Sequence, residues 1–174
     1  MSRPARVLVL ANQKGGVAKT TTTLNLGAAL KERGCRVLAI DLDPQSNLSM
    51  SQGVDIEALA TTMYDVLVTG RPLSEVIFAK EIDIAAAGIE LAGAELALSG
   101  MIGRERALDR TIKPYRDLYD YILIDTPPSL GLLTINALTA ASGVIVPVQC
   151  EYLSLRGLVQ LENTRHIIFP GTYR

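Results

Sequence analysis

The chain has 174 residues, of which 48% are hydrophobic, and this is enough for one folded domain with its own core. A formal net charge of −1 and an isoelectric point near 5.8 exclude an overall basic field for binding nucleic acid. No apolar run approaches the roughly 20 residues that a membrane-spanning helix needs, and the apolar stretch after the basic N-terminus is too short for a signal peptide. We therefore expect a soluble, cytoplasmic protein without a membrane partner.

Short apolar runs alternate with helical patterns, which is typical of a mostly parallel, doubly wound sheet with helices on both faces. Strands are expected at residues 7–11, 37–40, 82–86, 121–124 and 144–148. Pro147 predicts that the last strand ends there or pairs on one side only. Helices are expected at residues 20–33, 63–68, 92–117, 132–141 and 154–168, with Gly34 closing the first. No linker or repeat is visible, so residues 1–174 are interpreted as one α/β domain.

The stretch ANQKGGVAKTT, residues 11–21, connects the first strand to the first helix. Backbone N–H groups and the positive end of a helix dipole meet at such a junction, which suits an anion. Lys19 supplies a cation for phosphates and Thr20 a hydroxyl for magnesium. The pattern GxxxxGK[ST] nevertheless fails twice, because Gln13 and Ala18 stand at its two glycine positions. Taken alone, the loop is compatible both with a phosphate site and with an ordinary strand-to-helix turn.

Three aspartates follow predicted strands at the edge where open α/β sheets bind their ligands. Asp41 and Asp43 lie in DLDPQSN after the second strand, and Asp125 lies in YILIDTPPS after the fourth. A carboxylate like Asp125 can reach the shell of a magnesium ion beside a phosphate loop. A dinucleotide site would use Asp41 for a ribose, but the loop lacks G-x-G-x-x-G and the Lys-Thr pair would then be unexplained. The combination favours a magnesium-dependent nucleotide site.

Four segments, NQKGGVAKTTT, DLDPQSN, IDTPPSLGLLTINAL and VPVQCEYLSLRGLVQLENT, together resemble the ParA/Soj family of deviant Walker-type ATPases, which partition chromosomes and plasmids. The resemblance covers residues 6–164 and is closest to the short, chromosomal type. It implies a P-loop NTPase fold, ATP and Mg²⁺ as cofactors, an ATP-bound homodimer, and a partner of the ParB/Spo0J type that stimulates hydrolysis. Non-specific DNA binding and association with the nucleoid are further properties of the family.

The resemblance also implies roles for individual residues. Lys14 would reach the phosphates bound by the neighbouring subunit, and Gly15 would let the two backbones approach. Asp43 would position or activate the attacking water, so Lys14 and Asp43 are the candidate catalytic residues. Thr20, Asp41 and Asp125 are the candidates for the magnesium site. The nucleotide would be bound by Lys14, Gly15, Gly16, Val17, Ala18, Lys19, Thr20 and Thr21. Segments 44–47 and 126–129 would sense the γ-phosphate.

Two departures from the family pattern bear on activity. Ala18 stands where the family has glycine, and a Cβ atom disfavours a positive φ angle at about 1–3 kcal/mol. The sequence also stops after QLENTRHIIFPGTYR, whereas family members continue through segments that complete the sheet, line the adenine pocket and bind DNA. We therefore expect an incomplete sheet, and no residue can be assigned to base selectivity or DNA binding. Basic residues at positions 106, 110 and 113 on one predicted helix face are more typical of a solvated surface than of a DNA contact.

Three other functions stay open at this level. A nucleotide-responsive or inert binding module, derived from a ParA-like protein, would explain Ala18 and the early C-terminus. A small-molecule ligase or kinase of the dethiobiotin synthetase type would share the loop, but no acceptor pocket is recognisable. A MinD-like membrane protein would need a C-terminal amphipathic helix, which Pro170 would interrupt.

Overall fold

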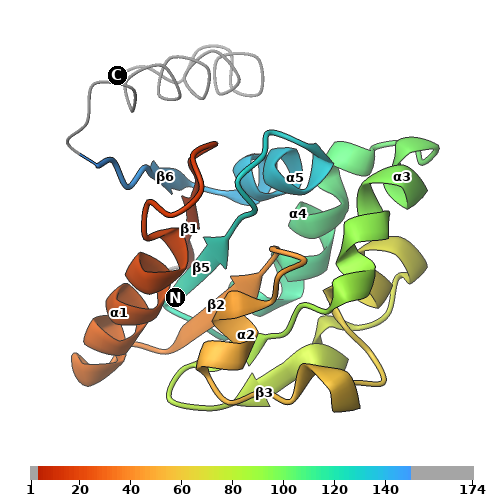
Figure 1. Ribbon diagram of the computed structural model, residues 1–174. Coiled ribbons are helices and arrows are strands. Elements are labelled where there is room, and N and C mark those ends of the chain that lie inside the picture. The colour runs from red at the N-terminus through yellow and green to blue at the C-terminus, as the bar shows by residue number, and fades with distance from the viewer. Residues whose placement is uncertain (1–3, 150–174) are drawn as a thin grey trace.

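A computed structural model describes residues 4–149, and its centre is a six-stranded sheet with the order β3-β4-β2-β5-β1-β6 (Figure 1). Neighbouring strands are parallel except for the antiparallel pair β3–β4. The strands are β1 (Arg6–Leu10), β2 (Val37–Asp41), β3 (Ile77–Ala79), β4 (Asp83–Ala85), β5 (Tyr121–Asp125) and β6 (Gly143–Ile145). The predicted mostly parallel α/β sheet is confirmed. All five predicted strands are present, whereas the short edge strand β3 was not predicted.

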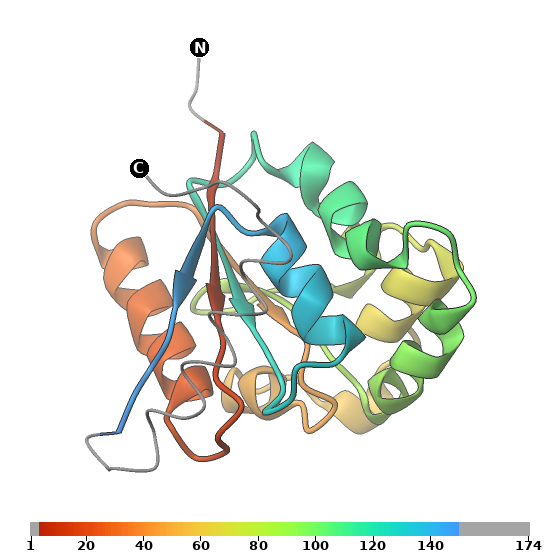
Figure 2. The ribbon, with the colours of Figure 1, turned by 90° about the horizontal axis from the view of Figure 1, so that it is seen from above.

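Helices cover both faces of this sheet, as predicted (Figure 2). One face carries α1 (Lys19–Glu32) and α2 (Asn47–Ser51); the other carries α3 (Ala94–Ser99), α4 (Ala107–Ile112) and α5 (Leu132–Ala140). Shorter 3₁₀ segments are η1 (Ile56–Ala58), η3 (Leu73–Val76), η4 (Ile89–Gly93), η5 (Arg104–Arg106) and η6 (Lys113–Tyr115), and η2 (Asp65–Thr69) is a π-helix. The helix predicted at 154–168 lies outside the described residues.

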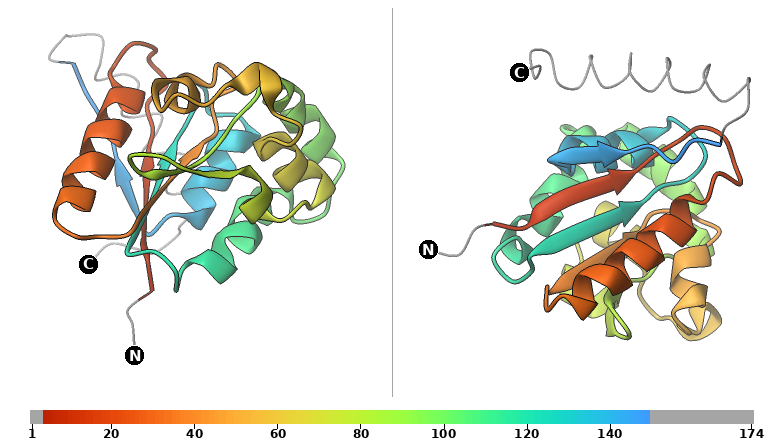
Figure 3. Two further views of the ribbon diagram at one scale, coloured as in Figure 1. Left: turned by 90° about the horizontal axis from the view of Figure 1, so that it is seen from below. Right: turned by 90° about the vertical axis from the view of Figure 1, so that its left-hand side faces the viewer.

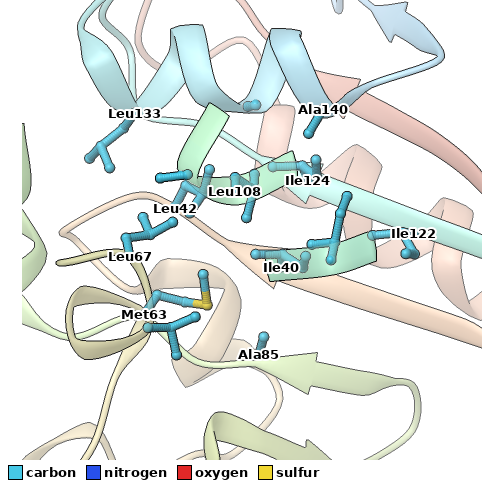
Figure 4. Packing of buried hydrophobic residues seen from close by; sticks show 14 of the residues in the cluster. Ile40, Leu42, Met63, Leu67, Ala85, Leu108, Ile122, Ile124, Leu133 and Ala140 are labelled. Atoms are coloured by element: carbon cyan, nitrogen blue, oxygen red, sulfur yellow. The ribbon is translucent and has the colours of Figure 1, made fainter. Parts of the chain in front are cut away.

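The side chains of strand β5 contribute to the hydrophobic cores on both faces of the sheet. Ile122 and Ile124 are fully buried in the cluster under α4 and α5, where Figure 4 shows Ile124 beside Leu108. Leu123 is fully buried in the other cluster, which contains leucines of α1. Side chains alternate between the two faces of a strand, so a continuous apolar run is what a sheet covered on both sides requires.

The single long helix predicted at residues 92–117 is wrong. The chain instead forms α3, leaves the helical path at Gly100, and turns at Gly103 with a φ angle of +67° before η5, α4 and η6. A left-handed backbone is cheap for glycine and ends an α-helix. The break also separates the predicted apolar stripe, since Leu98 is fully buried whereas Ile102 is 100% exposed.

The ends of the other predicted elements agree well with the structure. Helix α1 is followed by Gly34, whose φ angle of +82° and bond from its N–H to the Lys31 carbonyl match the predicted C-terminal cap. Strand β6 ends at Ile145, before Pro147, and in the described part of the sheet it pairs only with β1. Both outcomes predicted from Pro147 are therefore confirmed.

The parallel register brings the carboxyl ends of β1, β2 and β5 to one edge of the sheet. Figure 3 (right) shows β1, β5 and β6 running side by side in the same direction. Leu10 at the end of β1 and Asp41 at the end of β2 both pair with Asp125 of β5. The loop after β1, the segment after β2 and the segment after β5 therefore start side by side. Within residues 4–149, no helix has the length and hydropathy to cross a bilayer.

The break after α3 generates a prediction about stability. Leu98→Ala should lower the free energy of unfolding by about 2–5 kcal/mol, because it leaves a cavity in the core. Ile102→Ala should change it by less than about 0.5 kcal/mol, because the side chain is in solvent. Urea unfolding of both variants and the wild-type chain would check this. Equal destabilisation by the two substitutions would contradict the break after α3 and would support one continuous apolar helix face.

Candidate functional site

The loop after β1 presents the amino end of α1 without a side-chain cap. No side chain among the described residues caps α1, and its first turn has no acidic residue. The first backbone N–H groups of an α-helix have no partners within the helix, so this end can accept an anion. Ala18, immediately before the helix, has φ 63° and ψ 32°. The left-handed angle anticipated at this position is present, and it is adopted by alanine.

Lys19 lies in the first turn of α1 with its ammonium group turned back over the loop. Its Nζ donates to the Lys14 carbonyl at 3.4 Å, and the side chain is only 7% exposed. Burial lowers the pKa of Lys19, and the nearby carboxylates of Asp125 and Asp43 oppose this effect. An anion bound at the loop would add a further opposite charge beside the buried ammonium group.

Thr20 joins the helix to the neighbouring strand. Its Oγ1 donates to Asp125 Oδ2 at 2.5 Å, and Thr23 Oγ1, one turn later, lies 3.5 Å from Asp125 Oδ1. Burial raises the pKa of Asp125 to about 6, although the Thr20 hydrogen bond and the charge of Lys19 both lower it. A hydroxyl and a carboxylate thus converge beneath the amino end of α1.

Asp41 is fully buried and holds the segment that follows β2. Its Oδ1 accepts the Asp43 N–H at 3.0 Å, and its Oδ2 accepts the Ser49 N–H at 2.9 Å and the Ser49 hydroxyl at 2.7 Å. Burial raises the pKa of Asp41 to about 7 against the opposing effect of these bonds. The Ser49 hydroxyl in turn accepts the N–H of Ala87. Ser49 was missed in the sequence, where only the aspartates of this segment stood out.

A cavity of about 560 Å³ opens in front of these groups. Its lining consists of Gly15, Gly16, Val17, Ala18, Lys19, Thr20, Thr21, Asp43, Gln45, Asn47, Ser51 and Pro128. Seven consecutive loop and helix residues predicted to bind a nucleotide therefore surround one space, together with Asp43. Asp41 and Asp125 lie behind this lining, and both are fully buried.

Lys14 is not among the lining residues, and its side chain contacts the segment after β6. Its Nζ donates to Gln149 Oε1 at 3.0 Å, and Gln149 Nε2 donates to the Gly16 carbonyl at 3.1 Å. Asn12 braces the same connection, because its Nδ2 donates to the Pro147 carbonyl at 2.8 Å and its Oδ1 accepts the Lys14 N–H at 3.0 Å. Asn12 and Gln149 received no role from the sequence, although both belong to its quoted motifs.

The donor set suits magnesium better than a metal held by protein alone. Among residues 4–149, no group of three His, Cys, Asp or Glu side chains is arranged to hold a metal ion. Magnesium keeps several waters and combines one or two protein oxygens with substrate phosphates. The Thr20 hydroxyl and the Asp125 carboxylate next to an anion-binding helix end fit this pattern.

Comparison with known proteins places this arrangement in a family. A family model described as an AAA domain matches residues 5–169. The chain belongs to this AAA domain family. It is 48% identical over 166 residues to the sporulation initiation inhibitor protein Soj of Bacillus subtilis, and 43% identical over 169 residues to the chromosome partitioning protein ParA of Myxococcus xanthus. These alignments cover 94% and 95% of the chain, so the resemblance to the ParA/Soj family is confirmed.

A solved structure shares the fold closely. It is described as cobyrinic acid a,c-diamide synthase from Mycobacterium smegmatis with bound ATP analogue and magnesium, and it is 46% identical with a TM-score of 0.92. The match covers 97% of this chain and 70% of that one. The chain spans 66% of the length of Soj and 60% of that of ParA.

Ala18 gives the first prediction from the site. In a left-handed conformation, alanine is about 1–2 kcal/mol less favourable than glycine. Replacing Ala18 by glycine removes this cost from the folded chain, but the greater freedom of glycine in the unfolded chain offsets part of the stabilisation. Ala18→Gly should therefore raise the free energy of unfolding by about 0.5–1 kcal/mol. Gly16→Ala should lower it, since Gly16 has φ +72°, whereas Gly15→Ala should be close to neutral because Gly15 has open space and no positive φ. Urea unfolding without nucleotide would check this order of stabilities. An Ala18→Gly variant less stable than the wild-type chain would contradict the prediction.

The buried carboxylates give a second prediction. Because the pKa of Asp41 and Asp125 is raised on folding, the folded chain binds more protons than the unfolded chain between about pH 4 and 7. Stability should therefore fall as pH rises through this window. Asp125→Asn should reduce the fall by on the order of 2 kcal/mol. Urea unfolding at pH 5 and pH 7.5 would measure it, and an unchanged pH slope in the variant would contradict it.

Proposed function

We propose that the chain is a ParA/Soj-like partitioning ATPase that binds ATP with Mg²⁺ and hydrolyses it. The observation that carries this proposal is the Thr20–Asp125 hydrogen bond of 2.5 Å, placed beneath the uncapped end of α1 and beside Lys19. A helix end, a lysine and a hydroxyl–carboxylate pair together match what a triphosphate with magnesium needs. The bound ATP analogue and magnesium of the Mycobacterium smegmatis relative support the same assignment.

Each residue then has a separate part in the reaction. Lys19 and the loop N–H groups would hold the phosphates, Thr21 would contact the α-phosphate, and Thr20, Asp41 and Asp125 would organise the magnesium site. When bound, the metal neutralises charge on the phosphate oxygens. Asp41 contributes by fixing the segment that bears Asp43, because it accepts the Asp43 N–H. Asp43 lines the cavity and orients the attacking water.

Lys14 has its role between two subunits. Its Nζ donates to Gln149, and Lys14 is not among the residues that line the cavity. We propose that in an ATP-bound homodimer this ammonium group reaches the phosphates of the other subunit, and that Gly15 allows the close approach of the two loops. A ParB-type partner would stimulate hydrolysis by this dimer. A cytoplasmic location and any association with DNA or the nucleoid remain predictions from the resemblance.

The strain at Ala18 supports one alternative, a nucleotide-responsive or inert module that does not hydrolyse ATP. The name of the Mycobacterium smegmatis relative suggests another, an amide-forming synthase that needs an acceptor acid and an amine. Phosphate release and ATP binding distinguish these three functions. Phosphate release without an acceptor supports the partitioning ATPase, release only with an acceptor supports the synthase, and no saturable ATP binding supports the inert module.

Hydrolysis is tested with Asp43→Ala. We expect the wild-type chain to release phosphate from ATP only with Mg²⁺, and the variant to lose at least about tenfold in turnover while retaining ATP binding, because positioning of water affects the chemical step. Asp55→Ala is the matched control, since it removes the same carboxylate from an exposed residue outside the cavity lining. Equal phosphate release from wild type and Asp43→Ala would remove the assigned mechanism.

The same preparations test the subunit arrangement. Light scattering of Asp43→Ala with ATP, with ADP and without nucleotide should show a dimer only with ATP, because unhydrolysed ATP persists in this variant. Adding Lys14→Ala should abolish the dimer without abolishing ATP binding. A mass that is the same under all three conditions would count against Lys14 acting between subunits.

A further inference from the structure

Glu95 of α3 reaches the beginning of a helix that is remote from it in sequence. Its Oε1 accepts the backbone N–H of Leu133, at 3.4 Å, in the first turn of α5. Gly131 precedes α5 and has no side chain to cap it, and the first turn of α5 contains no acidic residue. A carboxylate at this position satisfies an N–H group that lacks a helical partner and interacts favourably with the helix dipole.

Gly131 is shaped around this carboxylate. A Cβ atom built on Gly131 would lie 1.9 Å from Glu95 Oε1 and 2.6 Å from Oε2. The φ angle of Gly131 is −74°, so its backbone conformation is open to any residue. The need for glycine here is therefore the space that the Glu95 side chain occupies. Two independent features, the bond to Leu133 and the missing side chain at position 131, lead to the same contact.

This contact lies at one end of the segment that borders the nucleotide cavity. The segment runs from Asp125 to α5, and its Pro128 lines the cavity. Its first part is held by the Thr126 hydroxyl, which donates to the Leu10 carbonyl at 2.8 Å. Its second part is held from α5, because the Thr134 hydroxyl donates to the Ser129 carbonyl at 2.7 Å. Fraying of the first turn of α5 would release the second of these two attachments.

We propose that Glu95 is a positioning residue for ATP hydrolysis, which acts by fixing the first turn of α5 and, through it, the Thr126–Gly131 segment. It touches neither the cavity lining nor the candidate magnesium ligands. Its effect reaches the site through the Thr134–Ser129 bond. Turnover would then depend on a residue of α3, a helix outside the four motifs that resemble the family. This inference rests on the proposed ATPase function.

The test uses Glu95→Ala, Glu95→Gln, Gly131→Ala and the double variant Glu95→Ala/Gly131→Ala. Glu90→Gln is the matched control, since it removes the same charge from an exposed residue shortly before α3. Gly131→Ala is the sharpest variant, because the added methyl displaces the flexible end of Glu95 while the glutamate remains. Hydrogen exchange of the amides at 132–135 reports on the cap without nucleotide. Turnover of ATP and affinity for ADP report on the site.

We expect Glu95→Ala and Gly131→Ala each to accelerate exchange at 132–135 by about fivefold, the size typical of a lost helix cap, and to lower turnover by about fivefold. Affinity for ADP should be unchanged, because the loop and Lys19 are untouched. Glu95→Gln should recover part of the loss, since its amide oxygen still accepts from Leu133. The double variant should be no worse than either single variant, because both remove one contact.

The inference has two parts, the cap that Glu95 provides for α5 and the effect of this cap on turnover, and a different result would refute each part. Full turnover in Glu95→Ala and Gly131→Ala, or additive losses in the double variant, would refute the positioning role even if exchange is faster. Unchanged exchange at 132–135 in Glu95→Ala would refute the cap itself. Absence of turnover in the wild-type chain would instead refute the proposed ATPase, and the exchange data would still decide whether Glu95 holds α5.

Discussion

The hydrogen bond from Thr20 to Asp125 ties together the parts of the chain that form the candidate site. Thr20 lies in the first turn of α1, and Asp125 ends β5, the strand between β1 and β2. The loop between β1 and α1 is consequently fixed at both ends: β1 is paired with β5 along its length, and the helix start is bonded to the last residue of the same strand. Removing the Asp125 side chain would leave the register intact but detach the helix from it. The Thr20–Asp125 bond therefore links residues 15–21 directly to the edge of the sheet.

Two buried aspartates at the same sheet edge are used differently, although they are paired in register. Asp41 bonds three backbone and hydroxyl donors around β2, and it organises the segment that carries Asp43. Among residues 4–149, the Asp125 carboxylate bonds hydroxyl groups of α1, those of Thr20 and Thr23. Burial raises the pKa of both carboxyl groups. Without a ligand, burial makes the ionised carboxylate of Asp125 unfavourable. A cation bound nearby would stabilise this ionised form, so the buried carboxylate would favour metal binding.

The sequence predicted the sheet and the loop well because both depend on local patterns. Apolar runs that end in Asp41 or Asp125 identify parallel strands and their functional ends, and glycine with Lys-Thr identifies the anion site. Residues 92–117 were misinterpreted because helical periodicity continues through Gly100 and Gly103, and periodicity does not reveal a change in chain direction. Glu95 and Gln149 were missed for a different reason. Each acts on a segment distant in sequence, and no spacing rule connects Glu95 with Leu133 or Gln149 with Gly16.

Backbone strain is concentrated at this site in a way that composition alone does not reveal. Within the described residues, the non-glycine residues with positive φ are Ala18, at 63°, and Ser46, at 53°. Ala18 precedes α1 and Ser46 precedes α2, so both stand at turns that border the same cavity. Among residues 4–149, the buried Ser46 hydroxyl has no hydrogen-bond partner, which adds a desolvation cost to the strained backbone. Such conformations persist only where surrounding contacts impose them, and here the Ala18 carbonyl accepts from the Thr22 N–H and hydroxyl while Asp43 accepts from the Ser46 N–H. Backbone strain is therefore held on two sides of one cavity, at the start of α1 and in the segment that follows Asp43.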